Sequence, residues 1–149
     1  SRGRPDTAVG HYRDAIDRNP FLAEARKRYG EALERSDDLA GALDQYAVYL
    51  RLKPEDFDAA FARAGLVAKR DPVAGDAVWD SLLERFPRRP EALVQAGRHF
   101  FVRSAAGTDV AQKRALKEKA RKALDTALEI DPENESAAAI RTELEKLPW

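Results

Sequence analysis

Regularly spaced prolines constrain the fold of this chain more than any other feature of its sequence. Successive members of the set are separated by 34, 33 and 45 residues, and they are Pro20, Pro54, Pro87 and Pro132. Because proline lacks a backbone N–H, it cannot continue a preceding helix, so each one is expected to end a helix and to begin a turn. The spacing therefore indicates an internal repeat with a period close to that of two short helices.

Small residues recur at matching places between these prolines. Gly30, Gly65 and Gly97 fall in the expected first helices, and Ala42, Gly75 and Ala120 fall in the second helices. A glycine inside a helix costs about 1 kcal/mol relative to alanine, so its repetition indicates a packing reason. We expect two helices to cross closely at these places. The pattern predicts an all-α chain built from antiparallel helical hairpins.

Composition excludes several classes of function. The chain has 149 residues, of which 44% are hydrophobic, and this is enough to bury a core without cysteines or metals. Basic residues (Lys plus Arg) and acidic residues (Asp plus Glu) number 26 each. The chain therefore has no net positive charge that would attract nucleic acid or an anionic membrane. No apolar run is long enough to span a bilayer. The sequence therefore predicts a soluble chain, cytoplasmic or periplasmic, with no nucleic-acid partner, no direct membrane insertion and no cofactor.

The spacing of Gly, Ala, aromatic residues and Pro resembles the tetratricopeptide repeat family, which has a period of about 34 residues. The resemblance covers nearly the whole chain and implies one domain over 1–149, a right-handed superhelical α-solenoid of about eight helices. It implies a second helix of a partial repeat, three full repeats and a terminal capping helix. Their ranges are 6–20, then 22–54, 56–87 and 90–132, and finally 134–147.

Two features depart from the family pattern. The tryptophan favoured in first helices is replaced by Arg26, Phe61 and Leu93, and the last repeat carries an insertion near 101–113. Either both helices of that repeat are longer or its turn projects. We favour an extended second helix from about Val110 to Glu129, with Asp109 as its N-cap.

The inserted region is strongly basic. Residues 113–122 contain six basic side chains in ten positions. The stretch is either a solvated helix face, whose positive charge Glu118 partly offsets, or a docking patch for an acidic partner.

Catalytic motifs are missing from the sequence. Neither His11 nor His99 has a second histidine at metal-ligand spacing, the chain has no cysteine, and no serine lies in a nucleophile-elbow motif. We therefore predict that the chain is not an enzyme and has no catalytic or metal-binding residues.

The family resemblance also implies a concave groove lined by the first helices, which binds a peptide or protein segment. The residues carried over to that groove are mildly basic as a set, and an acidic or C-terminal peptide is the expected ligand. They are Lys27, Arg28, Glu31, Arg63, Leu66, Gln95 and Arg98.

One subclass of the family grips the terminal carboxylate of chaperone tails with lysines, asparagines and an arginine. Lys27 matches its first lysine, but Glu31 and Arg63 stand at the asparagine places. Glu91 and Gln95 replace the final lysine and arginine. The resemblance therefore disfavours binding of heat-shock protein tails.

Three functional alternatives stay open at the level of sequence. The first is a protein-binding scaffold of the kind common in bacterial assembly and secretion systems. The second is a module that recruits substrates to a larger enzyme, such as a glycosyl- or sulfotransferase. The third is self-association through the terminal helix, because Ala8, Tyr12 and Ala15 would form a bare apolar face if the first helix of that repeat is absent.

Overall fold

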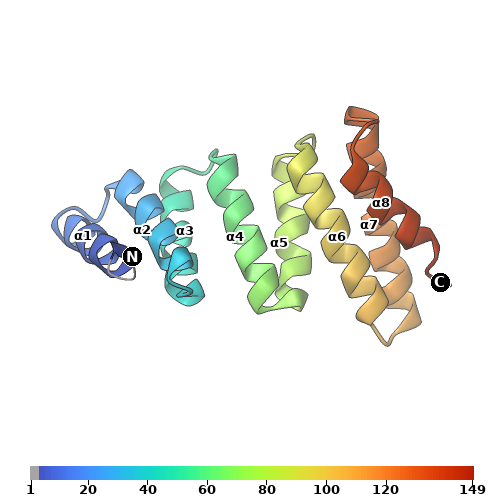
Figure 1. Ribbon diagram of the computed structural model, residues 1–149, viewed down its shortest axis with the longest axis horizontal. Coiled ribbons are helices and arrows are strands. Elements are labelled where there is room, and N and C mark those ends of the chain that lie inside the picture. The colour runs from blue at the N-terminus through green and yellow to red at the C-terminus, as the bar shows by residue number, and fades with distance from the viewer. Residues whose placement is uncertain (1–3) are drawn as a thin grey trace. The chain divides into compact units, whose positions relative to one another are not determined.

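The computed structural model describes residues 4–149, with side chains from residue 7 onward, so the first three residues of the expected domain lie outside the described part. Within that part the chain forms eight helices and no strand (Figure 1). The helices are α1 Arg4–Arg18, α2 Ala23–Arg35, α3 Leu39–Leu52, α4 Phe57–Arg70, α5 Pro72–Arg85, α6 Pro90–Ala106, α7 Val110–Ile130 and α8 Glu135–Glu145. The expected all-α fold of eight helices is confirmed.

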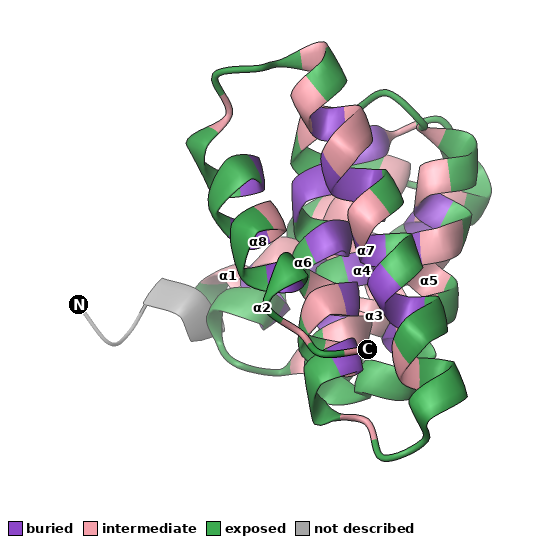
Figure 2. Cartoon of the chain, turned by 90° about the vertical axis from the view of Figure 1, so that its right-hand side faces the viewer, coloured by how far each residue is buried: buried purple, intermediate pink, exposed green. Residues whose placement is uncertain are grey.

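The chain divides into two compact units, one ending at Arg70 and the other running from Asp71 to Trp149. The expected second repeat, 56–87, takes α4 from the first unit and α5 from the second. The repeat boundaries stay a prediction. Figure 2 shows buried positions as stripes along the helices, with exposed residues on their other sides, as amphipathic helices in a helical stack require.

The first unit packs α1 on α2, α2 on α3 and α3 on α4. Its core combines alanines with three tyrosines, and it consists of Ile16, Ala25, Tyr29, Leu33, Ala42, Tyr46, Tyr49, Ala59 and Leu66. Gly30 allows a close crossing here, because an added Cβ would lie 3.2 Å from the Tyr46 ring. Tyr12 and Ala15 are half-buried against this core. The α1 face that was expected to be bare is therefore partly covered.

The expected close contact at Gly65 is not made within the first unit. Gly65 is exposed, and a Cβ built there would meet no heavy atom of this unit within 4 Å. The sequence pattern marks Gly65 as equivalent to Gly30, but only Gly30 faces a neighbouring aromatic ring.

The second unit packs α5 on α6, α6 on α7, and α8 on both α6 and α7. Gly97 faces Leu124, and an added Cβ would lie only 2.7 Å from its side chain. Trp79 and Phe100 are buried and place two aromatic side chains in its core. On α8, Ala137, Ile140 and Leu144 are also buried and form an apolar stripe along the terminal helix.

Helix ends follow simple capping chemistry. Asp71 accepts hydrogen bonds from the N–H groups of Val73 and Ala74, and Pro72 is the first residue of α5. Asp109 accepts from the N–H of Gln112 at the start of α7. In the last hairpin both helices are long, 17 residues in α6 and 21 in α7. The insertion therefore extends the helices, and the expected extended second helix is confirmed.

The C-terminal segment is anchored to the second unit by polar contacts. The indole N–H of Trp149 donates to Ser104 Oγ at 2.9 Å, and Lys113 lies over the ring with its ammonium 3.4 Å from the centroid. Lys117, buried in α7, donates to the backbone oxygens of Leu147 and Trp149 at 2.8 and 2.7 Å. These contacts satisfy a cation that would otherwise be costly to bury.

Candidate functional site

Lys27 on α2 was expected to face a ligand, but its charge is used within the first unit. Its ammonium donates to Asp56 Oδ2 at 2.9 Å and lies 5.5 Å from the centroid of the Tyr49 ring. Asp56 also accepts from the Tyr49 hydroxyl at 2.5 Å and from the Ala59 N–H at 3.0 Å. This cluster ties α2 to the end of α3 and the start of α4.

Hydrogen bonding in this cluster changes the acidity of its members. Burial acts to raise the pKa of Asp56, but hydrogen bonds from Tyr49, Lys27 and the Ala59 N–H outweigh it and lower that pKa to about 2. The hydrogen bond to Asp56 raises the pKa of Lys27. The ion pair therefore stabilises the fold over the whole neutral range of pH.

Arg28 and Glu31 lie on the surface of α2 and pair with each other. Arg28 Nη1 is 3.1 Å from Glu31 Oε2, and its Nε is 3.3 Å from Glu24 Oε1. These are neighbours one turn apart on an exposed helix face, where such pairs contribute little to stability. Both side chains are accessible to a partner, but their charges largely cancel.

Leu66 was expected in the groove, and this prediction is wrong. Only 6% of the residue is exposed, and it belongs to the core of the first unit together with Ala59. Residues 59 and 66 are seven apart, so they share one face of α4, and that face turns toward the core. Arg63, one turn before Leu66, is half-buried. It forms no ion pair or hydrogen bond with any described residue.

Gln95 and Arg98 lie together on the exposed side of α6. They are three residues apart and therefore share a face of the helix, while Ala92, Leu93 and Ala96 are buried on the other sides. The Arg98 side chain has no partner among the residues that the structure describes. The expected groove combines residues of both units, and as one surface it stays a prediction.

Sequence reasoning missed a polar cluster that joins α5 to α6. Asp76 accepts from Arg103 Nε at 3.1 Å and Nη2 at 3.0 Å, and its Oδ1 lies 2.7 Å from His99 Nε2. Burial acts to raise the pKa of Asp76, but the hydrogen bonds from Arg103 and His99 lower it. No residue spacing indicated this contact, because Asp76 and Arg103 are 27 positions apart in the chain. The cluster accounts for the one histidine of the second unit.

The basic stretch of α7 is mostly used inside the second unit. Lys113 and Lys117 hold the C-terminal segment, Lys119 pairs with Asp80, and Arg121 pairs with Glu118 and Glu145. Arg114 and Lys122 remain exposed, with no ion pair to a described residue. The stretch is therefore far less available to an acidic partner than its sequence suggested.

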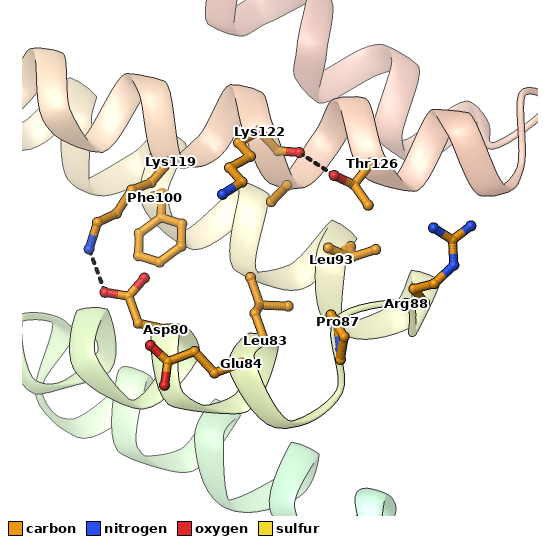
Figure 3. A pocket seen from close by; sticks show the side chains of 11 residues that line it. Asp80, Leu83, Glu84, Pro87, Arg88, Leu93, Phe100, Lys119, Lys122 and Thr126 are labelled. Carbon is orange, nitrogen blue, oxygen red and sulfur yellow. Dashed lines mark hydrogen bonds and ion pairs between the residues drawn. The ribbon is translucent and has the colours of Figure 1, made fainter.

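The second unit contains a groove of about 780 Å³ between α5, α6 and α7 (Figure 3). Leu83, Leu93, Phe100 and Ala123 supply apolar lining, and charged side chains stand around them. The other lining residues are Asp80, Glu84, Pro87, Arg88, Lys119, Lys122 and Thr126. Lys119 and Lys122 belong to the basic stretch that the sequence singled out, but the groove itself was not expected, because its lining comes from three helices whose packing decides that they meet.

No group of His, Cys, Asp or Glu side chains in the described part of the chain could hold a metal ion. Among the eight helices described, none is both long and apolar enough to cross a bilayer.

No protein-family model and no curated protein sequence matches the chain. Solved structures do match it. A tetratricopeptide repeat protein from Parabacteroides merdae aligns over 97% of this chain and 54% of its own, with 20% identity and a TM-score of 0.80. MamA residues 41 to the end from Desulfovibrio magneticus align over 98% of this chain and 86% of their own, with 19% identity and a TM-score of 0.68.

The first tetratricopeptide domain of Spaghetti (RPAP3), solved with the HSP90 peptide SRMEEVD, aligns over 83% of this chain and 90% of its own. Its identity is 16% and its TM-score is 0.65. The chain has the tetratricopeptide repeat fold. It spans about half the length of the Parabacteroides protein.

Proposed function

We propose that this chain is a non-catalytic protein-interaction module that binds an acidic protein segment through exposed side chains of its first helices. The tetratricopeptide fold supports this proposal, because stacked hairpins present long, rigid helix faces. A neighbour with the same fold was solved with a bound peptide. The same activity would serve a free scaffold or a recruiting module within a longer protein.

Arg98 is the observation that carries the proposal. Its guanidinium is exposed and has no partner in the described part of the chain, whereas Lys27 and Arg103 are committed to Asp56 and Asp76. An unpaired arginine is suited to bind a carboxylate through two parallel hydrogen bonds. Gln95, one turn away, adds an amide that can donate and accept. Arg63 on α4 offers a second unpaired guanidinium.

The acidic ligand proposed here differs from a chaperone tail. Lys27, which matches the first lysine of the chaperone-binding subclass, is held by Asp56. Glu91, at the place of the final lysine, is exposed and would repel a terminal carboxylate. We therefore expect the peptide SRMEEVD to bind no better than a scrambled peptide of the same composition, as measured by calorimetry.

Affinity isolation with charge-reversed variants tests the proposed surface. Proteins retained by the wild-type chain from cells that produce it should be lost with Arg98→Glu and reduced with Arg63→Glu, because each change replaces an attraction by a repulsion. Arg114→Glu is the matched control, since this exposed residue of α7 carries the same charge elsewhere in the second unit. Circular dichroism should show unchanged helicity. If Arg98→Glu retains the same proteins as the control, the proposed surface is wrong.

A further inference from the structure

The walls of the α5–α6–α7 groove are helix faces of matching length. On α7 the lining residues are 119, 122, 123 and 126, and on α5 and the turn after it they are 80, 83, 84 and 87. Both sets follow the spacing i, i+3, i+4 and i+7, which marks one face of a helix over two turns, or about 10 Å. Leu93 and Phe100 of α6, also seven apart, lie between them. The groove is therefore a trough bounded by two helical ridges.

One end of the trough is closed by a charge pair. Lys119 Nζ bonds to Asp80 Oδ2 and lies 5.4 Å from the centroid of the Phe100 ring (Figure 3). Because these two charges neutralise each other across the groove, they need no outside partner. Phe100 is buried beneath this pair, so a bound segment would meet this end mainly through the half-buried Leu83.

Unpaired charges stand along the rest of the trough. Lys122, Arg88 and Glu84 form no ion pair with any residue in the described range. In Figure 3 the Lys122 side chain reaches from α7 toward the α5 wall, and Arg88 stands beside Pro87 at the far end. Two cations face one anion here, so an occupant with carboxylates at its edges would be favoured.

The floor of the groove favours a helix over an extended peptide. All three walls are helices, whose backbone groups are already bonded within each helix, so they offer no edge for an added strand. An extended segment would find no backbone partner for its own N–H and C=O groups where it lies against Leu83 and Pro87. A helix satisfies these groups internally, and its ridge fits between two neighbouring ridges.

We propose that the α5–α6–α7 groove binds one amphipathic helix of a partner protein, with apolar side chains against Leu83 and Pro87 at its mouth and carboxylates facing Lys122 and Arg88. This site shares no residue with the Arg98 surface, although both involve α6. Arg98→Glu should therefore leave binding in the groove unchanged. The two proposals can thus be tested, and can fail, independently.

Selection from a displayed library of helical peptides, with the full chain as target, tests the kind of ligand. Enriched sequences should carry large apolar residues at spacings of three, four and seven, with Asp or Glu beside them. Binding of an enriched synthetic peptide should weaken at least tenfold with Leu83→Lys, which places a charge on the apolar floor. Enrichment of sequences without helical spacing, or equal binding by Leu83→Lys, would overturn the proposal.

Exchanging charges between Lys122 and the peptide tests which side of the bound helix faces α7. The exchange carries little risk to the fold, because Lys122 is exposed. Lys122→Glu should weaken binding of the acidic peptide about fivefold or more, and a Glu→Lys change in the peptide should restore it. Arg114→Glu, on the same helix but outside the groove, is the matched control and should have little effect. Equal effects of Lys122→Glu and Arg114→Glu would contradict the assignment of Lys122 as a contact to the carboxylates of the bound helix. If the free chain dimerises as its concentration rises, and if Lys122→Glu abolishes this dimerisation, the groove binds a second copy of the chain. That result would overturn the proposal that it binds a helix of a partner protein.

Discussion

Glycine at position 97 permits a close helix crossing in the second unit. An alanine Cβ there would lie 2.7 Å from Leu124 Cγ, and Leu124 is fully buried and cannot move away freely. We expect Gly97→Ala to destabilise the protein by about 1–2 kcal/mol, because overpacking outweighs the gain in helix propensity. Urea unfolding measures this.

Gly10 in α1 supplies the matched control for that substitution. A Cβ at Gly10 would meet nothing within 4 Å, so Gly10→Ala should stabilise by about 0.5–1 kcal/mol through helix propensity alone. Equal effects of the two substitutions would mean that Gly97 is not in a tight crossing.

Asp56 gives the first unit a defined sensitivity to acid. Its pKa falls from 3.8 to about 2 on folding, so the unfolded chain binds the proton more tightly. The stabilisation is present above the unfolded pKa and is lost as pH falls from about 4 to 2, up to roughly 2 kcal/mol. We expect Asp56→Asn to be less stable at pH 6 and to lose less stability than the wild type between pH 6 and 2.5. Parallel losses in denaturant titrations at the two pH values would contradict this.

At the scale of elements, the long helix α7 depends on a side-chain cap at its start. Asp109 Oδ1 accepts from the Gln112 N–H at 3.0 Å, and a carboxylate also complements the positive end of the helix dipole. Asp109→Ala should lower the free energy of unfolding by about 1 kcal/mol. Asp109→Asn should lose less, because its amide oxygen can still cap. Thr108→Ala, one residue earlier in the turn, should be nearly neutral in the same thermal unfolding assay.

At the scale of the whole molecule, the second unit has a core and polar contacts of its own. Asp76 with His99 and Arg103, and Trp149 with Ser104, all lie between Asp71 and Trp149. We expect a fragment of residues 71–149 to fold alone and to unfold cooperatively in urea. Both tryptophans, Trp79 and Trp149, lie in this unit, so their fluorescence follows it directly. A fragment without a sigmoidal transition would show that its stability depends on the rest of the chain.

The sequence by itself determined the helices and their ends. Prolines, capping aspartates and the small residues at the crossings act within one helix or between neighbours in the chain, so their spacing could be read as hairpins. The extended helix from Val110 followed from the same local rules.

Only the tertiary structure decided which polar side chains are free. Lys27 is neutralised by Asp56, 29 residues away, and Lys119 by Asp80, 39 residues away. Leu66 turns to the core because its face of α4 meets α3. The groove beside Lys122 likewise exists because three helices leave a trough where their side chains do not interdigitate. Such contacts depend on how distant helices pack, which no spacing along the chain records.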